Sequence, residues 1–244
     1  MRTPMDAPPP RRWSAACSST RRGSDKMSDA ACSTLLRSPL HAFDLPARAA
    51  LPGAHHRVLL SELAHLGYLV LRGKADDAAF MQAVAQVLGQ SPPTRPMTLA
   101  STAGGALLWL SPDEWLLVCK RSDRTASLQA LNAALGDAFA QVVDNSGGLT
   151  TLRLAGPDHL LLLRQLGPYD FESLAPGRCV SSVISKATVI VARSDEAGVL
   201  LVLRRSFADY LWRLIERSAQ PYRPCIVAPA QCADPVFAPL LESA

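Results

Sequence analysis

The sequence predicts an α+β protein built from two ferredoxin-like repeats of the βαββαβ type. Two observations predict this class. Apolar runs of strand length alternate with segments in which apolar residues recur at helical spacing. Their order is β-α-β-β-α-β over about residues 57–146 and β-α-β-β-α over 147–218, and the first order is that of a ferredoxin-like unit. We expect either one domain with internal pseudosymmetry or two packed lobes.

The first repeat opens with the apolar run at 66–73, which predicts a strand. The next segment predicts a helix over 76–89, with Asp76 as its N-cap and Gly89 at its end. The apolar stripe of this helix consists of Ala79, Phe80, Ala83, Val84, Val87 and Leu88.

The first repeat continues, after a proline-rich loop, with a short hairpin. Its strands are predicted at 106–111 and 115–120, around a Pro-Asp-Glu turn. A second helix is predicted over 125–139, opened by Thr125, and a strand over 140–146 closes the repeat.

The second repeat follows the same rhythm but has no closing strand. Its strands are predicted over 149–156, 179–194 and 198–205, and its helices over 157–167 and 206–218. The run at 198–205 is apolar at nearly every position, which is typical of a strand covered on both faces.

The last predicted helix carries two apolar strips. Ser206 and Asp209 fit a capping box that starts the helix. Trp212 lies off the main stripe, beside Ala208 and Ile215, so the helix is either wedged between two elements or faces another chain. The main stripe, expected to face the core, consists of Phe207, Tyr210, Leu211 and Leu214.

Two arginines mark the junction between this strand and this helix. Arg204 and Arg205 are either ordinary cations at the end of a strand or partners of carboxylates across an interface. Trp212 would contribute about 2 kcal/mol or more as a buried interface anchor. The candidate subunit-interface residues are Arg204, Arg205, Trp212 and Trp115.

The two ends of the chain differ from the region between them. Residues 1–37 are predicted to be a disordered extension, because residues 1–26 are rich in Pro, Arg and Ser and lack hydrophobic periodicity. They contain no apolar segment of a secretory signal. Residues 1–26 are either a transit peptide or the result of a wrongly assigned start codon. We favour the second alternative, with Met27 as the true start. Residues 219–244 are expected to be an irregular tail, which leaves 38–218 as the domain.

Composition excludes several classes of function. The first 26 residues hold six basic and two acidic side chains, which leaves 19 of each in the rest of the chain. A neutral body is a poor partner for nucleic acid. No apolar run reaches the roughly 18 residues of a membrane span.

Cysteines and histidines show no metal-binding spacing. The six cysteines form no C-x-x-C pair and are expected to be small buried thiols. His55 and His56 have no cysteine or carboxylate at ligand spacing, so we expect surface imidazoles. The cysteines are Cys17, Cys32, Cys119, Cys179, Cys225 and Cys232.

The sequence lacks the motifs of common enzyme classes. No G-x-G-x-x-G follows a strand, and neither a P-loop nor a G-x-S-x-G elbow occurs. The paired carboxylates of the 112–115 turn are expected to face solvent. Asp144 is expected to form an Asx turn, with a ligand-binding loop as the alternative. We predict no catalytic, cofactor-binding or metal residues, and a role in binding or assembly.

Four runs of the sequence are distinctive: LGYLVLRGKADDAAFMQAVAQVLG, LLWLSPDEWLLV, APGRCVSSVISKATVIVAR and LLVLRRSFADYLWRLI. They resemble one family, the gamma subunits of heterotetrameric sarcosine oxidase, from about Ser38 to Ser218. The segment SPLHAF at 38–43 also fits the usual opening of that family, which supports Met27 as the start.

This resemblance implies a function in a complex. Such enzymes demethylate sarcosine oxidatively to glycine, with hydrogen peroxide and formaldehyde, or methylene-tetrahydrofolate when tetrahydrofolate is present. The alpha and beta subunits carry FAD, FMN and NAD, and the delta subunit binds zinc. The gamma subunit carries no flavin and packs on the alpha subunit. The implied partners are thus the alpha, beta and delta subunits, and the implied location is the cytoplasm.

A second resemblance links VVDNSGGLTTLRLAGPDHLLLLRQL to folate-dependent aminomethyltransferases, whose fold contains ferredoxin-like repeats. Those enzymes carry a catalytic aspartate in a strand that corresponds here to 185–193, which has no acidic residue. A stand-alone folate-binding one-carbon transferase is the alternative function. A regulatory module that senses a small amino acid is a third.

Overall fold

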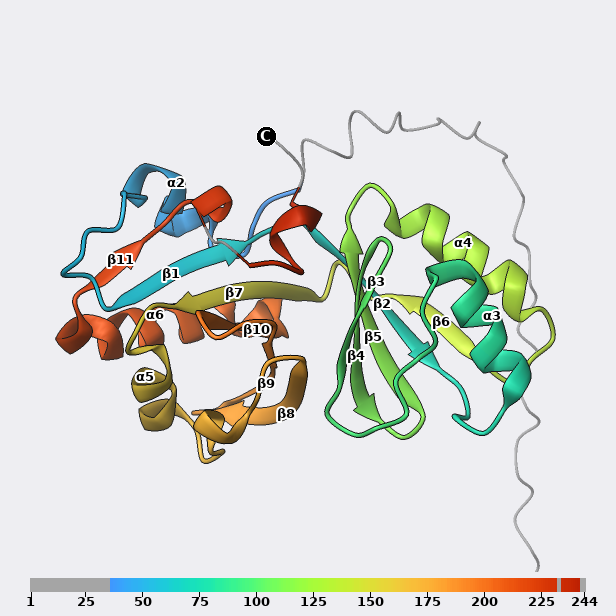
Figure 1. Ribbon diagram of the computed structural model, residues 1–244. Coiled ribbons are helices and arrows are strands. Elements are labelled where there is room, and N and C mark those ends of the chain that lie inside the picture. Colours follow the sequence, from blue (N-terminus) through green and yellow to red (C-terminus); the bar gives the residue numbers. More distant parts are fainter. Residues whose placement is uncertain (1–35, 232–233, 242–244) are drawn as a thin grey trace, which may run out of the picture. The chain divides into compact units, whose positions relative to one another are not determined.

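The computed structural model describes residues 36–231 and 234–241. Residues from Arg37 onward belong to one compact unit, and within the described ranges they form two β-sheets (Figure 1). The predictions for residues 1–35, including Met27, lie outside the described residues, as does Cys232. No described helix is long and apolar enough to cross a membrane.

The first sheet has the topology predicted for the first repeat. Its strand order is β3-β4-β5-β2-β6, and all its pairings are antiparallel. The four strands β4-β5-β2-β6 stand in the ferredoxin-like order, and β3 adds an edge strand where the sequence predicted only a loop. The elements are β2 (Leu66–Arg72), α3 (Ala78–Leu88), β3 (Leu99–Thr102), β4 (Gly105–Ser111), β5 (Glu114–Lys120), α4 (Arg124–Leu135) and β6 (Gln141–Asp144).

The second sheet completes the second repeat with a strand from the start of the domain. Its order is β11-β1-β7-β10-β9-β8, and β1 pairs antiparallel with β7. β1 thereby takes the fourth strand position, which the sequence of the repeat left empty. The elements are β1 (Val58–Leu63), β7 (Leu149–Ala155), α5 (His159–Leu166), β8 (Arg178–Ile184), β9 (Ala187–Arg193), β10 (Gly198–Arg204), α6 (Ala208–Ala219) and β11 (Pro224–Ile226).

Short helical turns connect these elements. They are η1 (His41–Phe43), α2 (Leu45–Arg48), η2 (Phe171–Ser173), η3 (Arg205–Phe207), η4 (Gln220–Tyr222), η5 (Pro229–Gln231) and η6 (Ala238–Leu240). The predicted strand at 179–194 is a hairpin of β8 and β9, because Ser185 adopts a left-handed conformation at the turn.

The predicted helix boundaries shift by one to four residues in the structure. Gly89 ends α3 in the left-handed conformation, as expected. The N-cap of α3 is Asp77, not Asp76, because the Asp77 carboxylate accepts a hydrogen bond from the backbone N–H of Ala79 at 2.9 Å. Helix α4 begins at Arg124, one residue before Thr125, and ends at Leu135, four residues before the predicted end at 139.

The predicted capping box of the last helix is wrong. The chain forms the 3₁₀ turn η3 first, and the N-cap of α6 is Phe207, without a side-chain cap. The carboxylate of Asp209 does not cap the helix, because it accepts hydrogen bonds from Arg213 one turn along, the shorter at 2.8 Å.

The predicted core stripe of this helix is wrong at Phe207 and Tyr210, which are 38% and 37% exposed. It is confirmed at Leu211, which is 0% exposed, and Leu214 is partly buried against the same cluster. Both strips have helical spacing, so periodicity alone could not choose between them. The strip containing Trp212 faces the second sheet, and α6 is therefore wedged within its own chain. The buried residues of α6 are Ala208, Leu211, Trp212, Ile215 and Ala219.

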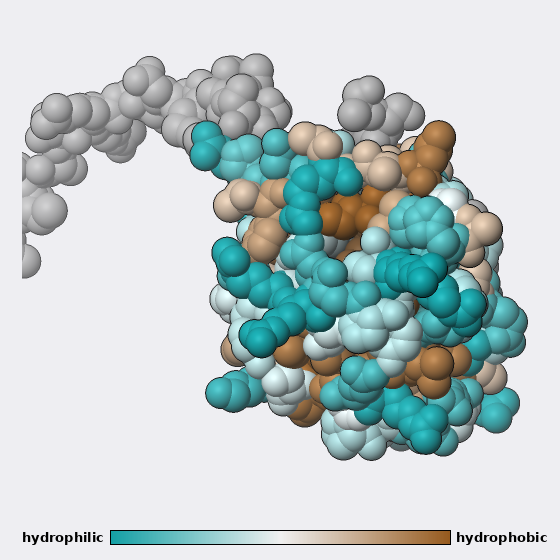
Figure 2. Space-filling view, turned by 90° about the vertical axis from the view of Figure 1, so that its left-hand side faces the viewer, coloured by the Kyte–Doolittle hydropathy of each residue, from teal (hydrophilic) through white to brown (hydrophobic). Residues whose placement is uncertain are grey.

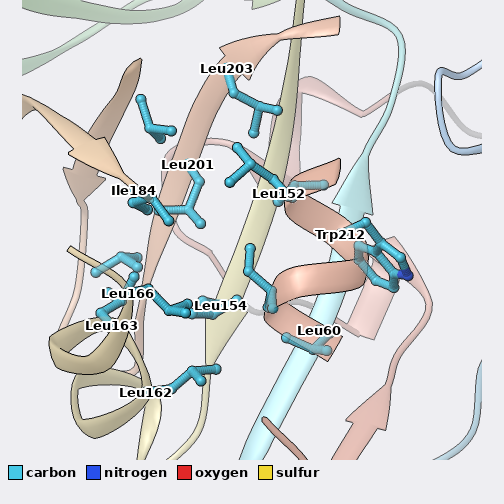
Figure 3. Packing of buried hydrophobic residues seen from close by; sticks show 14 of the residues in the cluster. Leu60, Leu152, Leu154, Leu162, Leu163, Leu166, Ile184, Leu201, Leu203 and Trp212 are labelled. Carbon is cyan, nitrogen blue, oxygen red and sulfur yellow. The ribbon is translucent and has the colours of Figure 1, made fainter. Parts of the chain in front are cut away.

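Three apolar clusters fill the spaces between the layers. One lies between the second sheet and helices α5 and α6, one between the two sheets, and one between the first sheet and helices α3 and α4. Figure 3 shows Leu201 and Leu203 of β10 in the first cluster, with Trp212 on α6. Leu200 and Val202 alternate with them and belong to the cluster between the sheets. β10 is therefore covered on both faces, as its sequence predicted.

The C-terminal segment is part of this fold. β11 pairs in parallel with β1, so the predicted irregular tail over 219–244 is wrong at 224–226. Beyond β11, Phe237 is 0% exposed and Leu240 is 5% exposed within the cluster between the sheets. Full burial of a phenylalanine side chain stabilises a fold by about 1.5–3 kcal/mol, so this segment helps hold the two sheets together.

We predict that Phe237→Ala lowers the free energy of unfolding by about 3–5 kcal/mol, because it leaves a cavity between the sheets. Chemical denaturation of the full chain measures this loss. The matched control is Phe139→Ala, at a phenylalanine that is 90% exposed, where we expect a change within about 0.5 kcal/mol. Equal effects of the two variants would contradict the assignment of the C-terminal segment to the core.

Candidate subunit interface

The two arginines at the end of β10 have different surroundings. Arg204 is exposed at the strand end. Arg205 is half-buried, and its guanidinium donates a hydrogen bond of 2.6 Å to the backbone carbonyl of Arg37. Its own backbone N–H donates to the carbonyl of Gly148 at 2.9 Å. Arg205 is thus a structural joint between three chain segments, whereas Arg204 faces solvent.

Beside this joint lies a buried carboxylate that the sequence analysis missed. Glu62 of β1 is 8% exposed and accepts hydrogen bonds from Ser38 Oγ and from Thr150 Oγ1, the latter at 3.1 Å. Burial raises the pKa of Glu62, against the opposing effects of these hydrogen bonds and of the Arg205 charge. The only sequence signal was one acidic residue inside the apolar run at 58–63.

A second buried polar contact joins the two repeats. The hydroxyl of Tyr68 in β2 lies 2.7 Å from the hydroxyl of Thr151 in β7. The backbone N–H of Tyr68 donates to Ser146 Oγ at 2.9 Å, in the connection between the repeats. The N–H of Ser146 in turn donates to the Asp144 carboxylate at 2.8 Å, which confirms the expected Asx turn. Burial raises the pKa of Tyr68, so its phenol stays neutral.

The two candidate tryptophans are interior residues. Trp115 is 0% exposed, packs near Phe80, and donates its indole N–H to the carbonyl of Pro93 at 2.8 Å. Trp212 is 1% exposed and packs near Phe43, with ring centroids 6.3 Å apart. Neither ring offers surface to another chain, so the interface role expected for them does not fit their burial.

Exposed aromatic side chains lie instead on the opposite strip of the same helix. Phe207 and Tyr210 project from the start of α6, and the Tyr210 hydroxyl lies 2.7 Å from Ser185 Oγ at the β8–β9 turn. Val183 of β8, which precedes that turn in the sequence, is 41% exposed. We call Arg204, Phe207 and Tyr210 the α6 surface. Periodicity had placed its two aromatic residues in the core.

A buried arginine anchors the C-terminal segment. Arg153 of β7 is 2% exposed. Its Nη1 lies 2.6 Å from Asp234 Oδ2, and its Nη2 lies 2.8 and 3.0 Å from the two carboxylate oxygens of Asp195. Asp234 also accepts from the backbone N–H groups of Val236 and Phe237 at 2.9 and 2.6 Å. This network fixes the segment that carries Phe237 against β7.

A buried histidine lies close to this network in the fold. His159, at the start of α5, is 4% exposed, and its Nδ1 is 2.6 Å from the carbonyl oxygen of Gly156. Burial lowers the pKa of His159, which keeps the imidazole neutral near pH 7. Gly156 has φ of +98°, and a side chain there would meet the backbone of Arg57. A glycine is therefore required where β7 turns toward α5.

The described cysteines are buried thiols, as expected for them. Burial raises the pKa of Cys119 to about 11 and that of Cys179 to about 12, and also raises the pKa of Cys225. His55 is exposed and His56 half-buried. In the described ranges, no three His, Cys, Asp or Glu side chains form a group that could hold a metal ion.

The paired carboxylates of the 112–115 turn each have a local partner. Ser111 Oγ donates to Asp113 at 2.5 Å, which lowers the pKa of that carboxyl. Glu114 accepts from the guanidinium of Arg72 at 2.5 and 3.1 Å across the strand pair. These contacts stabilise a hairpin turn and bring no nucleophile or second acid to it.

This fold defines a class, the α+β proteins with two ferredoxin-like repeats that resemble aminomethyltransferases. The structure of glycine cleavage system aminomethyltransferase T from Bartonella henselae matches with a TM-score of 0.61 and 17% identity. The match covers 79% of this chain and 59% of that one. At this identity the likeness concerns the fold alone.

The chain belongs to the sarcosine oxidase gamma subunit family, whose profile matches residues 72–220. Sarcosine oxidase subunit gamma from Arthrobacter sp. is 32% identical over 184 residues, which cover 72% of this chain and 86% of the relative. The subunit gamma from Corynebacterium sp. strain P-1 is 31% identical over 156 residues, covering 63% and 75%.

A solved structure gives the same family. A chain of heterotetrameric sarcosine oxidase from Corynebacterium sp. U-96, in complex with pyrrole 2-carboxylate, matches with a TM-score of 0.70 and 28% identity. The match covers 78% of this chain and 97% of that one. The predicted family and the aminomethyltransferase-like fold class are thereby confirmed.

We predict that Arg153→Ala lowers the free energy of unfolding by about 3–5 kcal/mol, because it leaves the carboxylate of Asp234 buried without a counter-charge. Arg164→Ala is the matched control, since Arg164 is 71% exposed and pairs with Glu172 at 3.3 Å. There we expect less than about 1 kcal/mol. Equal losses in chemical denaturation would contradict a structural role for the buried network.

We predict that Glu62 makes stability depend on pH. Its pKa is higher in the folded than in the unfolded chain, so its stabilising contribution is present below the unfolded value and is lost as pH rises through the folded value. The free energy of unfolding of the unsubstituted chain, minus that of Glu62→Gln, should therefore fall as the pH rises above the ordinary glutamate pKa of about 4.3.

The control for this measurement is Glu172→Gln, because the Glu172 side chain is 50% exposed. This substitution should change the free energy of unfolding by less than about 1 kcal/mol, because it removes only the solvent-exposed pair with Arg164. A flat difference for Glu62→Gln would show that burial does not perturb this carboxyl.

Proposed function

We propose that this chain is a non-catalytic subunit of a heterotetrameric sarcosine oxidase. In this role it supports the oxidative demethylation of sarcosine to glycine, with hydrogen peroxide and formaldehyde, or methylene-tetrahydrofolate, as the other products. The observation that carries the proposal is the family match over residues 72–220, together with the likeness to a chain of the Corynebacterium heterotetramer. The complex would act in the cytoplasm.

The chemistry of the described residues supports a non-catalytic role. The carboxylate of Glu62, the hydroxyl of Tyr68 and the two Nη atoms of Arg153 form hydrogen bonds that join separate chain segments. The described thiols are buried and have raised pKa values, so they are poor nucleophiles near neutral pH. FAD, FMN and NAD would be held by the partner subunits.

A stand-alone folate-dependent transferase has less support. In the resemblance to aminomethyltransferases, the strand of the catalytic aspartate corresponds to 185–193. That segment forms the end of the β8–β9 turn and β9, and it contains no carboxylate. These residues do not fit a tetrahydrofolate site of the aminomethyltransferase kind, and no step of the reaction is assigned to them.

The proposed docking surface for the alpha subunit is the α6 surface together with Arg205. Phe207 and Tyr210 present aromatic rings beside the exposed cation of Arg204. Aromatic side chains and arginine are enriched in protein interfaces, where they supply most of the binding free energy. We expect a partner surface that offers an apolar pocket and carboxylates.

The test is co-expression of the full chain with the other three subunits, followed by size-exclusion chromatography and an assay of sarcosine-dependent peroxide formation. We expect the chain to coelute with flavin-containing partners and to be colourless and inactive alone. The double variant Phe207→Asp with Tyr210→Asp should weaken assembly by about tenfold or more, because it removes two aromatic contacts.

The matched control is Phe139→Asp, at an exposed aromatic residue between α4 and β6 in the other repeat. This variant should assemble normally. Loss of assembly in Phe139→Asp alone would place the docking surface on the first repeat. Sarcosine oxidation by the isolated chain would overturn the non-catalytic role itself.

A further inference from the structure

A cavity of about 570 Å³ lies where the loop before β1 meets the segment that joins α6 to β11. Its walls come from the end of α2 and the loop after it, the last turn of α6 and the start of β11. Small-molecule sites have volumes of about 300–1,000 Å³, so this cavity has room for a ligand. Its polar lining residues are Arg48, His55, His56, Glu216, Gln220 and Arg223.

The cavity lies on the face at the left of Figure 1, where the end of α6 and the start of β11 lie beside the chain that leads into β1. Figure 2 views this face and shows hydrophilic side chains, in teal, on much of it. Arg48 and Arg223 are both exposed. Their side chains are therefore accessible to a dissolved ligand.

Arginines outnumber carboxylates in this lining. The guanidinium of Arg48 donates to the carboxylate of Glu216 through Nη2, which leaves its Nε and Nη1 groups as further donors. The guanidinium of Arg223 has no hydrogen bond or ion pair with any residue that the structure describes. One positive charge therefore remains uncompensated at the cavity, and it attracts an anion.

The backbone of Arg223 adopts a left-handed conformation, with φ of 49°. This conformation is uncommon for residues other than glycine and asparagine, and it costs free energy. The Arg223 side chain does not offset this cost with a polar contact inside the described part of the chain. The strained position and the unpaired guanidinium together point to a contact with a molecule outside this chain.

His56 adds a hydrogen-bond donor to the same lining. Its Nδ1 accepts a hydrogen bond of 2.8 Å from the backbone N–H of Gly53. The ring hydrogen is therefore on Nε2, which is a donor. The imidazole of His55 lies against this ring, with centroids 3.9 Å apart. Arg48, His56 and Arg223 thus supply donors from three positions in the wall.

The end of α6 would oppose an anion if its last carbonyl groups were free, because they carry the negative end of the helix dipole. The carbonyl of Glu216 accepts a hydrogen bond from the Gln220 side chain at 3.1 Å, and the carbonyl of Arg217 accepts one from the Gln220 backbone. The carbonyl of Gln220 accepts from the backbone N–H of Arg223 at 3.2 Å. These hydrogen bonds weaken the repulsion, so the arginines determine which charge the cavity prefers.

We propose that this cavity binds a small molecule that carries a phosphate monoester group. The three terminal oxygen atoms of such a group match the three donor side chains Arg48, His56 and Arg223. Arginine suits this role, because its planar guanidinium donates parallel hydrogen bonds to phosphate oxygens. The apolar lining residues Ala50 and Ile226 contact the rest of the molecule. The proposal is independent of the proposed subunit role, because it concerns a site within this chain.

The test uses inorganic phosphate as the probe, in phosphorus NMR titrations of the full chain at neutral pH. Sodium chloride holds the ionic strength constant, so charge screening does not change during the titration. We expect saturable binding with a dissociation constant at or below about 10 mM. Acetate should compete at least about threefold less well than unlabelled sulfate, because its carboxylate offers two oxygen atoms to three donor side chains.

Two variants connect binding to this cavity. Arg223→Gly removes the guanidinium and fits the left-handed backbone without strain, so the chain should fold and bind phosphate about tenfold more weakly. Glu216→Gln removes the lining carboxylate but keeps an acceptor for Arg48, and should strengthen phosphate binding by about threefold. Arg95→Gly, at another exposed loop arginine, is the matched control and should bind phosphate as the unsubstituted chain does.

Thermal unfolding of each variant shows whether it is folded before titration. No saturable phosphate binding by the folded, unsubstituted chain overturns the proposal. Unchanged binding in Arg223→Gly, or weaker binding in Glu216→Gln, overturns the assignment of phosphate to this cavity. Equal competition by acetate and sulfate overturns the choice of a phosphate group. Each of these outcomes leaves assembly with other subunits unaffected, so failure here is distinguishable from failure of the subunit role.

Discussion

The structure depends on the pairing of β1 with β7. The second repeat has three strands of its own for the ferredoxin-like core, and β1 supplies the fourth before the chain enters the first repeat. β11 then pairs with the outer edge of β1. The second sheet therefore has its full set of strands only when both β1 and β11 have paired. This pairing joins the second repeat to both ends of the domain, whereas the first sheet is built from strands of the first repeat alone.

Buried polar groups cluster along this same pairing. Glu62 lies on β1, while Thr150, Thr151 and Arg153 lie on β7. Apolar contacts between the sheets would tolerate small shifts, since they have no direction. A buried hydrogen bond or ion pair is strongly penalised when one partner is displaced. We infer that these groups fix the register of β1 on β7 and the position of the C-terminal segment, more than they add stability.

Helix α6 has two apolar strips with separate roles. One strip, with Trp212, covers the second sheet, and the other leaves Phe207 and Tyr210 partly exposed. The Tyr210 hydroxyl also lies 2.7 Å from Ser185 Oγ at the β8–β9 turn, so part of this strip contacts its own chain. Its remaining exposed aromatic surface is the reason why we propose it as a docking surface.

The sequence by itself determined the repeat rhythm, the two-sided burial of β10, the Asx turn at Asp144 and the family, because these depend on local periodicity, turn chemistry and residue runs. It missed β1, β3 and β11, since short strands at sheet edges or far from their repeat carry little local signal. It also placed Phe207 and Tyr210 of α6 in the core, and the only signal of the buried carboxylate of Glu62 was one acidic residue inside an apolar run. Only the tertiary structure decided these points, because burial depends on which distant segment covers a residue, and sequence spacing does not contain that information.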